Sequence, residues 1–61
     1  MDRERIRSNW NDKKGKLKER FAELSEADLY YNQGKEEELV DRIQTKTGKS
    51  KEEVIRMLEE L

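Results

Sequence analysis

The chain has 61 residues, of which 48% are charged and 31% are hydrophobic, and it contains neither cysteine nor histidine. These absences leave no disulfide, no thiolate metal site and no histidine for general acid–base catalysis. No apolar run approaches the roughly 18 residues of a membrane span, and the opening residues do not resemble a signal peptide. We therefore expect one domain over residues 1–61, in a cytoplasmic protein that is not an enzyme and binds no cofactor.

Charge is divided unevenly along the chain, although the net charge is only −1. Residues 1–24 carry eight Lys or Arg and five Asp or Glu, a balance of +3, whereas residues 25–61 carry six and ten, a balance of −4. Such asymmetry either steers a partner or lets the two halves attract each other. Because both values are small, we favour attraction within the fold.

The first predicted element is one long helix over residues 2–24. Its apolar residues are spaced four, seven, four and three apart, which places in one narrow helical stripe the side chains of Ile6, Trp10, Leu17, Phe21 and Leu24. Gly15 lies inside this helix. It is either a tolerated surface glycine, a kink, or a point where another backbone approaches closely.

Residues 25–34 predict a short second helix. Ser25 is a suitable N-cap, and Gly34 ends the segment just after the adjacent aromatic residues Tyr30 and Tyr31. A helix this short is stable only when it packs against another element. The alternative is a three-helix bundle in which this segment is a turn.

Residues 35–47 and 50–61 predict two helices joined as a tight hairpin. Gly48 stands where a left-handed cap ends the first of them, and Ser50 with Glu53 forms a capping box for the second. The whole chain thus predicts a small all-α bundle of about four helices, in the order long helix, short helix and hairpin, similar to the crossed hairpins of SAM-like domains. The predicted core consists of Ile6, Trp10, Leu17, Phe21, Leu24, Leu29, Leu39, Val40, Ile43, Val54 and Leu58.

A basic run in the first helix is the main candidate for a binding surface. Nucleic-acid binding requires cations clustered toward phosphates, and these residues spread around much of the helix, so we favour a solvated face. One of the two tyrosines is expected in the core, and an exposed one could stack on a base or a partner side chain. The candidate contacts are Lys13, Lys14, Lys16, Lys18, Arg20 and Tyr31.

Acidic residues are numerous but do not predict catalysis. General acid–base work needs two carboxyl groups in one cleft with separated pKa values, whereas these carboxylates fall on predicted solvent faces or first turns: Glu36 to Glu38, Glu52, Glu53, Glu59 and Glu60. No EF-hand spacing and no glycine-rich phosphate loop is present. We expect no catalytic, cofactor-binding or metal-binding residue.

The order of short motifs resembles that of the CsbD-like bacterial general stress proteins, over roughly residues 6–58. The resemblance rests on Asn9-Trp10, Lys14 to Glu19, Leu24-Ser25 with Asp28, Gly34-Lys35 with Leu39-Val40, and Ile43-Gln44 before Gly48. Ser8 and the pair Asp41-Arg42 stand where the family often has glycine and Gly-Lys. The resemblance implies a small helical domain whose abundance rises under stress, and it supplies no catalytic or binding residue.

We therefore expect a non-enzymatic stress-response protein that serves as a protein-interaction or structural module. Its binding surface would use exposed apolar edges such as Met57 and Leu61, or one of the tyrosines. The alternative is weak, nonspecific nucleic-acid binding through the basic first helix. We expect a monomer that does not bind membranes.

Overall fold

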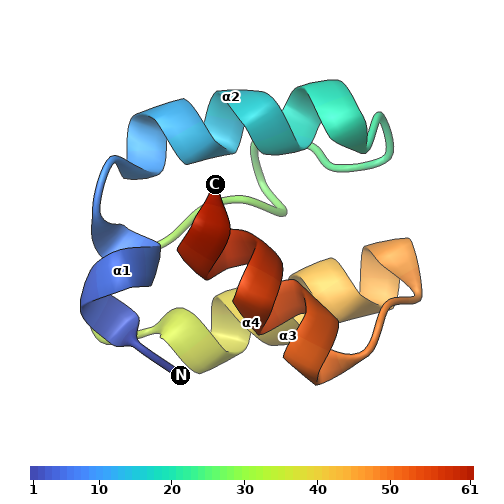
Figure 1. Cartoon of the computed structure of the whole chain (residues 1–61). Helices are drawn as coiled ribbons and strands as arrows, with labels where there is room; N and C mark the ends of the chain where they lie inside the picture. The colour runs from blue at the N-terminus through green and yellow to red at the C-terminus, as the bar shows by residue number, and fades with distance from the viewer.

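All 61 residues are described by the computed structural model, which contains four α-helices and no strand. In Figure 1, α2 lies across the top, the α3–α4 hairpin lies below it, and α1 closes one side. This arrangement confirms the all-α class and the number of helices. None of the helices is both long and apolar enough to cross a membrane. The helices are α1 (Arg3–Arg7), α2 (Trp10–Arg20), α3 (Glu36–Thr47) and α4 (Lys51–Glu60).

The single long helix predicted over residues 2–24 is wrong, because the chain breaks at Ser8 and Asn9. Ser8 is extended, and Asn9 adopts a left-handed conformation with φ of 54°. Asparagine tolerates that conformation better than most residues. The apolar stripe did not reveal the break, because Ile6 and Leu17 are both fully buried on either side of it. A helical period of apolar residues reports which side chains face the core, and not whether the backbone between them is continuous.

The segment between α2 and α3 consists of turns, so the alternative interpretation of residues 25–34 is the correct one. Ser25 and Asp28 still make the reciprocal hydrogen bonds of a helix start: the Ser25 N–H donates to Asp28 Oδ2 at 3.0 Å, and the Asp28 N–H donates to Ser25 Oγ at 3.3 Å. Gly34 has φ of 90° and reverses the chain before α3. The cap is present, but the segment is too short to continue as a helix. The hairpin expected between residues 2–24 and 25–34 is therefore absent.

The α3–α4 hairpin forms as predicted. Gly48 ends α3 with φ of 74°, and its N–H donates to the Gln44 carbonyl at 2.8 Å. Ser50 and Glu53 form the complete capping box at the start of α4. Both signals act over a few residues, which is why the sequence reveals them.

The core lies where α1, α2, the turn segment and the hairpin meet. It contains nine buried residues, all among those predicted: Ile6, Leu17, Leu24, Leu29, Leu39, Val40, Ile43, Val54 and Leu58. The other two predicted core residues, Trp10 and Phe21, are half-buried and pack against it. Gly15 faces open space, so no backbone approaches it closely.

Candidate functional site

Lys13, the first residue of the candidate basic run, is buried. Its side chain is 4% exposed, and Nζ donates hydrogen bonds to the Arg5 carbonyl and, at 3.4 Å, to the Ile6 carbonyl. Burial, followed by the nearby Arg5 charge, lowers the pKa of Lys13. These carbonyls belong to the end of α1, where no further helical N–H reaches them. Lys13 is therefore a cap for α1.

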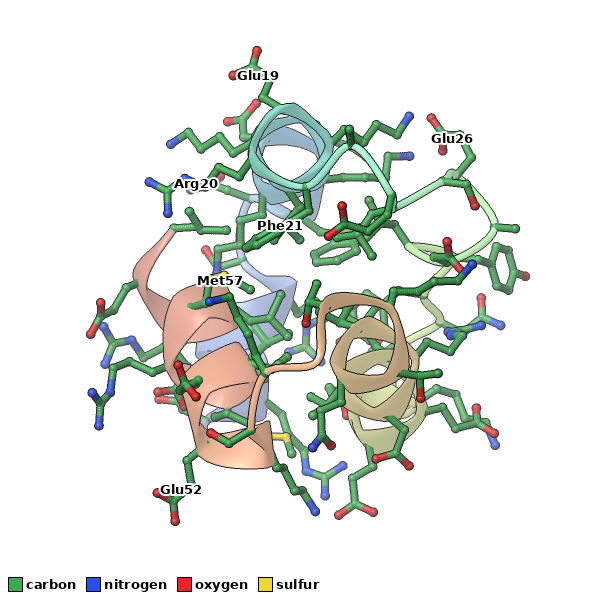
Figure 2. The ribbon with its side chains drawn as sticks, turned by 90° about the vertical axis from the view of Figure 1, so that its right-hand side faces the viewer. Glu19, Arg20, Phe21, Glu26, Glu52 and Met57 are labelled. Carbon is green, nitrogen blue, oxygen red and sulfur yellow. The ribbon has the colours of Figure 1, made fainter.

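Two more lysines of the basic run pair with one exposed carboxylate of the segment that follows α2. Lys14 pairs with Glu26 at 3.3 Å, and Lys18 makes a close ion pair with the same side chain. Hydrogen bonds from Lys18 and Lys14 lower the pKa of Glu26. Only Lys16 and Arg20 remain exposed without an ion pair, and Figure 2 shows Arg20 and Glu26 on opposite sides of α2. The structure thus does not bring the predicted basic residues together on one free face.

Tyr31, predicted as a possible contact, is half-buried and packs against the core. Its ring meets the Trp10 ring edge-on, with centroids 5.2 Å apart, and its hydroxyl donates a hydrogen bond to Glu36. Burial, together with that carboxylate, raises the pKa of Tyr31 to about 12. The exposed tyrosine is instead Tyr30, which is 62% exposed. Tyr31 is therefore held in place by contacts with Trp10 and Glu36.

Glu36 is the buried acidic group that sequence reasoning missed, because we placed it among solvated first-turn carboxylates. It is 1% exposed and accepts hydrogen bonds from Arg3 Nη1 and from the Gly34 N–H, each at 3.0 Å, besides the Tyr31 hydroxyl. The Tyr31 hydrogen bond, aided by backbone N–H groups and Arg3, outweighs burial and lowers the pKa of Glu36 to about 2. Glu36 thereby ties α1, the turn before α3 and α3 itself together. No local pattern separates it from its neighbours Glu37 and Glu38.

An open groove between the end of α2 and α4 is the main surface feature. Its volume is about 370 Å³, and Figure 2 shows Phe21 beneath the end of α2, on the side that faces Met57 of α4. Lys49 Nζ lies 5.7 Å from the centroid of the Phe21 ring. The sequence singled out Met57 and Leu61, and the structure adds a basic rim to them. The groove is lined by Arg20, Lys49, Glu53, Arg56, Met57, Glu60 and Leu61.

The polar side chains of the groove differ in how far they are already engaged. Glu53 Oε1 accepts hydrogen bonds from the Ser50 hydroxyl at 3.0 Å and the Ser50 N–H at 3.4 Å. These bonds, with the charges of Lys49 and Arg56, lower the pKa of Glu53. Arg20 and Arg56 are exposed and make no ion pair. No group of three or more carboxylates lies close enough to hold a metal ion. The groove therefore combines an apolar floor with free guanidinium groups, which suits contact with another molecule.

These features define a small all-α protein with one amphipathic surface groove and an internal polar network. No family model and no solved structure matches the chain. Among curated proteins, a UPF0337 protein of Pectobacterium atrosepticum is 40% identical over 52 residues, which cover 85% of this chain and 75% of that protein. The UPF0337 protein YjbJ of Escherichia coli strain K12 is 34% identical over 53 residues, covering 87% and 77%. A UPF0337 protein of Nitrosomonas europaea is 40% identical over 53 residues, but they cover only 56% of its length. The chain belongs to the UPF0337 family.

Proposed function

We propose that this UPF0337 protein is a non-enzymatic protein-interaction module of the bacterial stress response, and that it binds its partner in the groove between α2 and α4. The observation that carries the proposal is the groove itself. Its lining contains the half-buried side chains of Met57 and Leu61 together with the free guanidinium groups of Arg20 and Arg56. Apolar centres with arginine beside them are typical of protein-binding surfaces.

Two further observations support the non-enzymatic part of the proposal. The chain has no cysteine or histidine that could act as nucleophile or general base. Its strongly perturbed groups, Tyr31 and Glu36, are hydrogen-bonded to each other inside the fold. Perturbed pKa values mark catalytic groups only when those groups face a cleft. Here neither residue lines the groove.

Photo-crosslinking in living cells tests the binding surface. A photo-reactive amino acid is placed at position 57 in the groove, and in a control protein at position 30, where the exposed Tyr30 lies outside the groove. We expect a discrete adduct from position 57 that position 30 does not form. We also expect the adduct to weaken when Arg20→Glu is added. No adduct from position 57, or the same adduct from both positions, would refute the proposal.

The stress-response part rests on the motif order shared with CsbD-like proteins. It is tested by measuring the amount of this protein in its native bacterium during growth, on entry to stationary phase and after osmotic shock. We propose that the protein accumulates in the cytoplasm under at least one of these stresses. A constant amount of the protein under all of these conditions would refute the stress-response role, but it would not bear on the proposed binding surface.

Weak nucleic-acid binding is the second candidate function, because Lys16 and Arg20 remain exposed on α2. Fluorescence anisotropy of labelled duplex DNA and single-stranded RNA tests it at about 50 and about 200 mM salt. Binding at the lower salt that disappears at the higher salt, and in the double variant Lys16→Gln, Arg20→Gln, would support it. We expect no measurable binding, because Lys13, Lys14 and Lys18 are engaged within the protein.

A further inference from the structure

We infer that the occupant of the groove is an acidic protein segment in which one large apolar side chain is flanked by carboxylates. This inference rests on the proposed function and specifies the chemistry of the partner. Three features of the groove carry it: the balance of its charges, the shape of its apolar floor and the position of Lys49 between them.

Charge is the first feature. Arg20 and Arg56 lie on the two helices that border the groove, and neither makes an ion pair. Of the two carboxylates in the lining, Glu53 is already bound by Ser50 in the capping box. The groove therefore presents more unsatisfied positive than negative groups. Guanidinium groups bind carboxylates in a bidentate manner, so they favour an acidic segment.

The apolar floor is the second feature. Met57 and Leu61 are half-buried and line the groove, and Phe21, which is outside the lining, is half-buried against the same core. Methionine is flexible and polarisable, so its side chain adapts to different apolar partners. A volume of about 370 Å³ is near the lower end for binding pockets and accommodates a side chain rather than a folded element. The floor thus fits one anchor residue of an extended segment.

Lys49 connects the two features. Its ammonium group lies 5.7 Å from the Phe21 ring centroid, over the aromatic face, and its side chain lines the groove. A carboxylate next to the anchor residue would therefore meet Lys49 while the anchor touches Met57. A nucleic-acid backbone fits less well, because it carries no apolar side chain to fill the floor formed by Met57 and Leu61.

The test is a titration of the ¹⁵N-labelled 61-residue protein with short peptides, followed by amide chemical shifts. One peptide has a leucine flanked on both sides by glutamates, a second replaces the leucine by glycine, and a third replaces the glutamates by lysines. We expect saturable shifts for Arg20, Phe21 and residues 49–61 with the first peptide only, at a Kd of about 0.1–1 mM because the contact is small. A single-stranded RNA oligonucleotide serves as the fourth probe.

Two variants test which groups are used. The double variant Arg20→Gln, Arg56→Gln should weaken binding of the acidic leucine peptide about fivefold, since each exposed charge pair contributes modestly. The matched control Arg7→Gln, Lys16→Gln removes two charges outside the groove and should leave the Kd unchanged. Rising salt should weaken binding to the unmodified protein more than to the groove variant.

Each outcome decides for or against the inference. Shifts confined to the groove, with the first peptide only, support it. Equal binding of the lysine peptide, binding of RNA alone, or no binding of any probe overturns it. If the crosslink from position 57 still forms in cells after such a failure, the groove binds a partner of other chemistry, and the proposed function survives. If both fail, the groove is not a binding surface.

Discussion

The C-terminal hairpin α3–α4 is held by groups a few residues apart, whereas the start of α1 is also held by groups far along the chain. In the hairpin, Gly48 bonds to Gln44, and Ser50 bonds to Glu53. At the N-terminus, the Asp2 N–H donates to Glu59 Oε2 at 2.6 Å, across 57 positions of sequence. Arg3 reaches Glu36 across 33 positions. The first region is therefore organised locally, and the second depends as well on contacts with distant parts of the chain.

This difference predicts that α1 depends on the core rather than on its own helical propensity. A helix of five residues is far too short to form alone. Replacing its buried residue, Ile6→Ala, should lower the free energy of unfolding by about 3 kcal/mol, a large part of what so small a domain possesses. Urea denaturation measures the loss. The control Lys16→Ala, at an exposed position, should change stability by less than about 0.5 kcal/mol. If Ile6→Ala lowers the free energy of unfolding as little as the control does, α1 contributes little to the stability of the fold.

The second largest effect is expected at Glu36, which joins the two regions. Glu36→Gln should cost about 2 kcal/mol, because charged hydrogen bonds from Arg3 and Gly34 are weakened in a buried site. The exposed neighbour provides the control: Glu37→Gln should cost less than about 0.5 kcal/mol.

The same carboxylate predicts how stability depends on pH. The folded-state pKa of Glu36, about 2, lies below the ordinary value of 4.5, so its contribution is present above pH 4.5 and is lost as the pH falls toward 2. Denaturation at about pH 7 and about pH 3 should show a smaller acid-induced loss in Glu36→Gln than in Glu37→Gln. Tyr31, with a raised pKa of about 12, should lose its contribution as the pH rises from 10 through 12. Equal acid sensitivity of the two variants would show that the Glu36 carboxylate is not responsible for the loss of stability at low pH.

A smaller effect is expected from the lysine that caps α1. Lys13→Met keeps the length and the apolar stem of the side chain but removes the donor to the Arg5 and Ile6 carbonyls. We expect a loss of about 1–2 kcal/mol in urea denaturation, the cost of leaving partly buried carbonyls unpaired. Lys14→Met removes only the exposed pair with Glu26 and should cost at most about 0.5 kcal/mol. If the two variants lose the same amount, Lys13 is not a cap.

The smallest expected change in stability is that of Asn9→Ala, and its sign distinguishes a helix broken at Asn9 from a continuous one. Asn9→Ala should destabilise the protein by about 1 kcal/mol, because alanine is strained in the left-handed conformation that Asn9 adopts. In a continuous helix over residues 2–24, the same change would stabilise by about 0.5 kcal/mol through helix propensity. Gly48→Ala, at φ of 74° in the hairpin, is the matched control and should destabilise in either case. Thermal denaturation of the three proteins measures the difference.

Sequence reasoning succeeded where the physical cause is local. It predicted where α3 ends and where α4 begins, because a glycine cap and a capping box each act within one turn of helix. It also named Lys13 and Tyr31 as candidate contacts, and it did not anticipate the partners that they have within the protein. A lysine on a helix and a tyrosine beside another tyrosine carry no local mark of their eventual partners. For Lys13 these are the carbonyls of α1, and for Tyr31 they are Trp10 and Glu36.

The candidate groove shows the same division. Met57 and Leu61 stand at the edge of the apolar stripe of α4, so the sequence could single them out. Arg20 is about 40 residues away and was predicted to lie on a basic face of the first helix instead. Only the tertiary structure brings Arg20 into the lining of the same groove as Met57 and Arg56.

The order of amino acids was sufficient for the all-α class, the buried residues of the core and the capped hairpin, because apolar spacing and capping chemistry act through neighbours on one helix. Tertiary structure alone decided where the first helix breaks, which acidic group is buried and which basic residues remain free. Those outcomes depend on partners distant in sequence, such as Glu59 for Asp2 and Arg3 for Glu36, and such partners are defined only after the chain has packed.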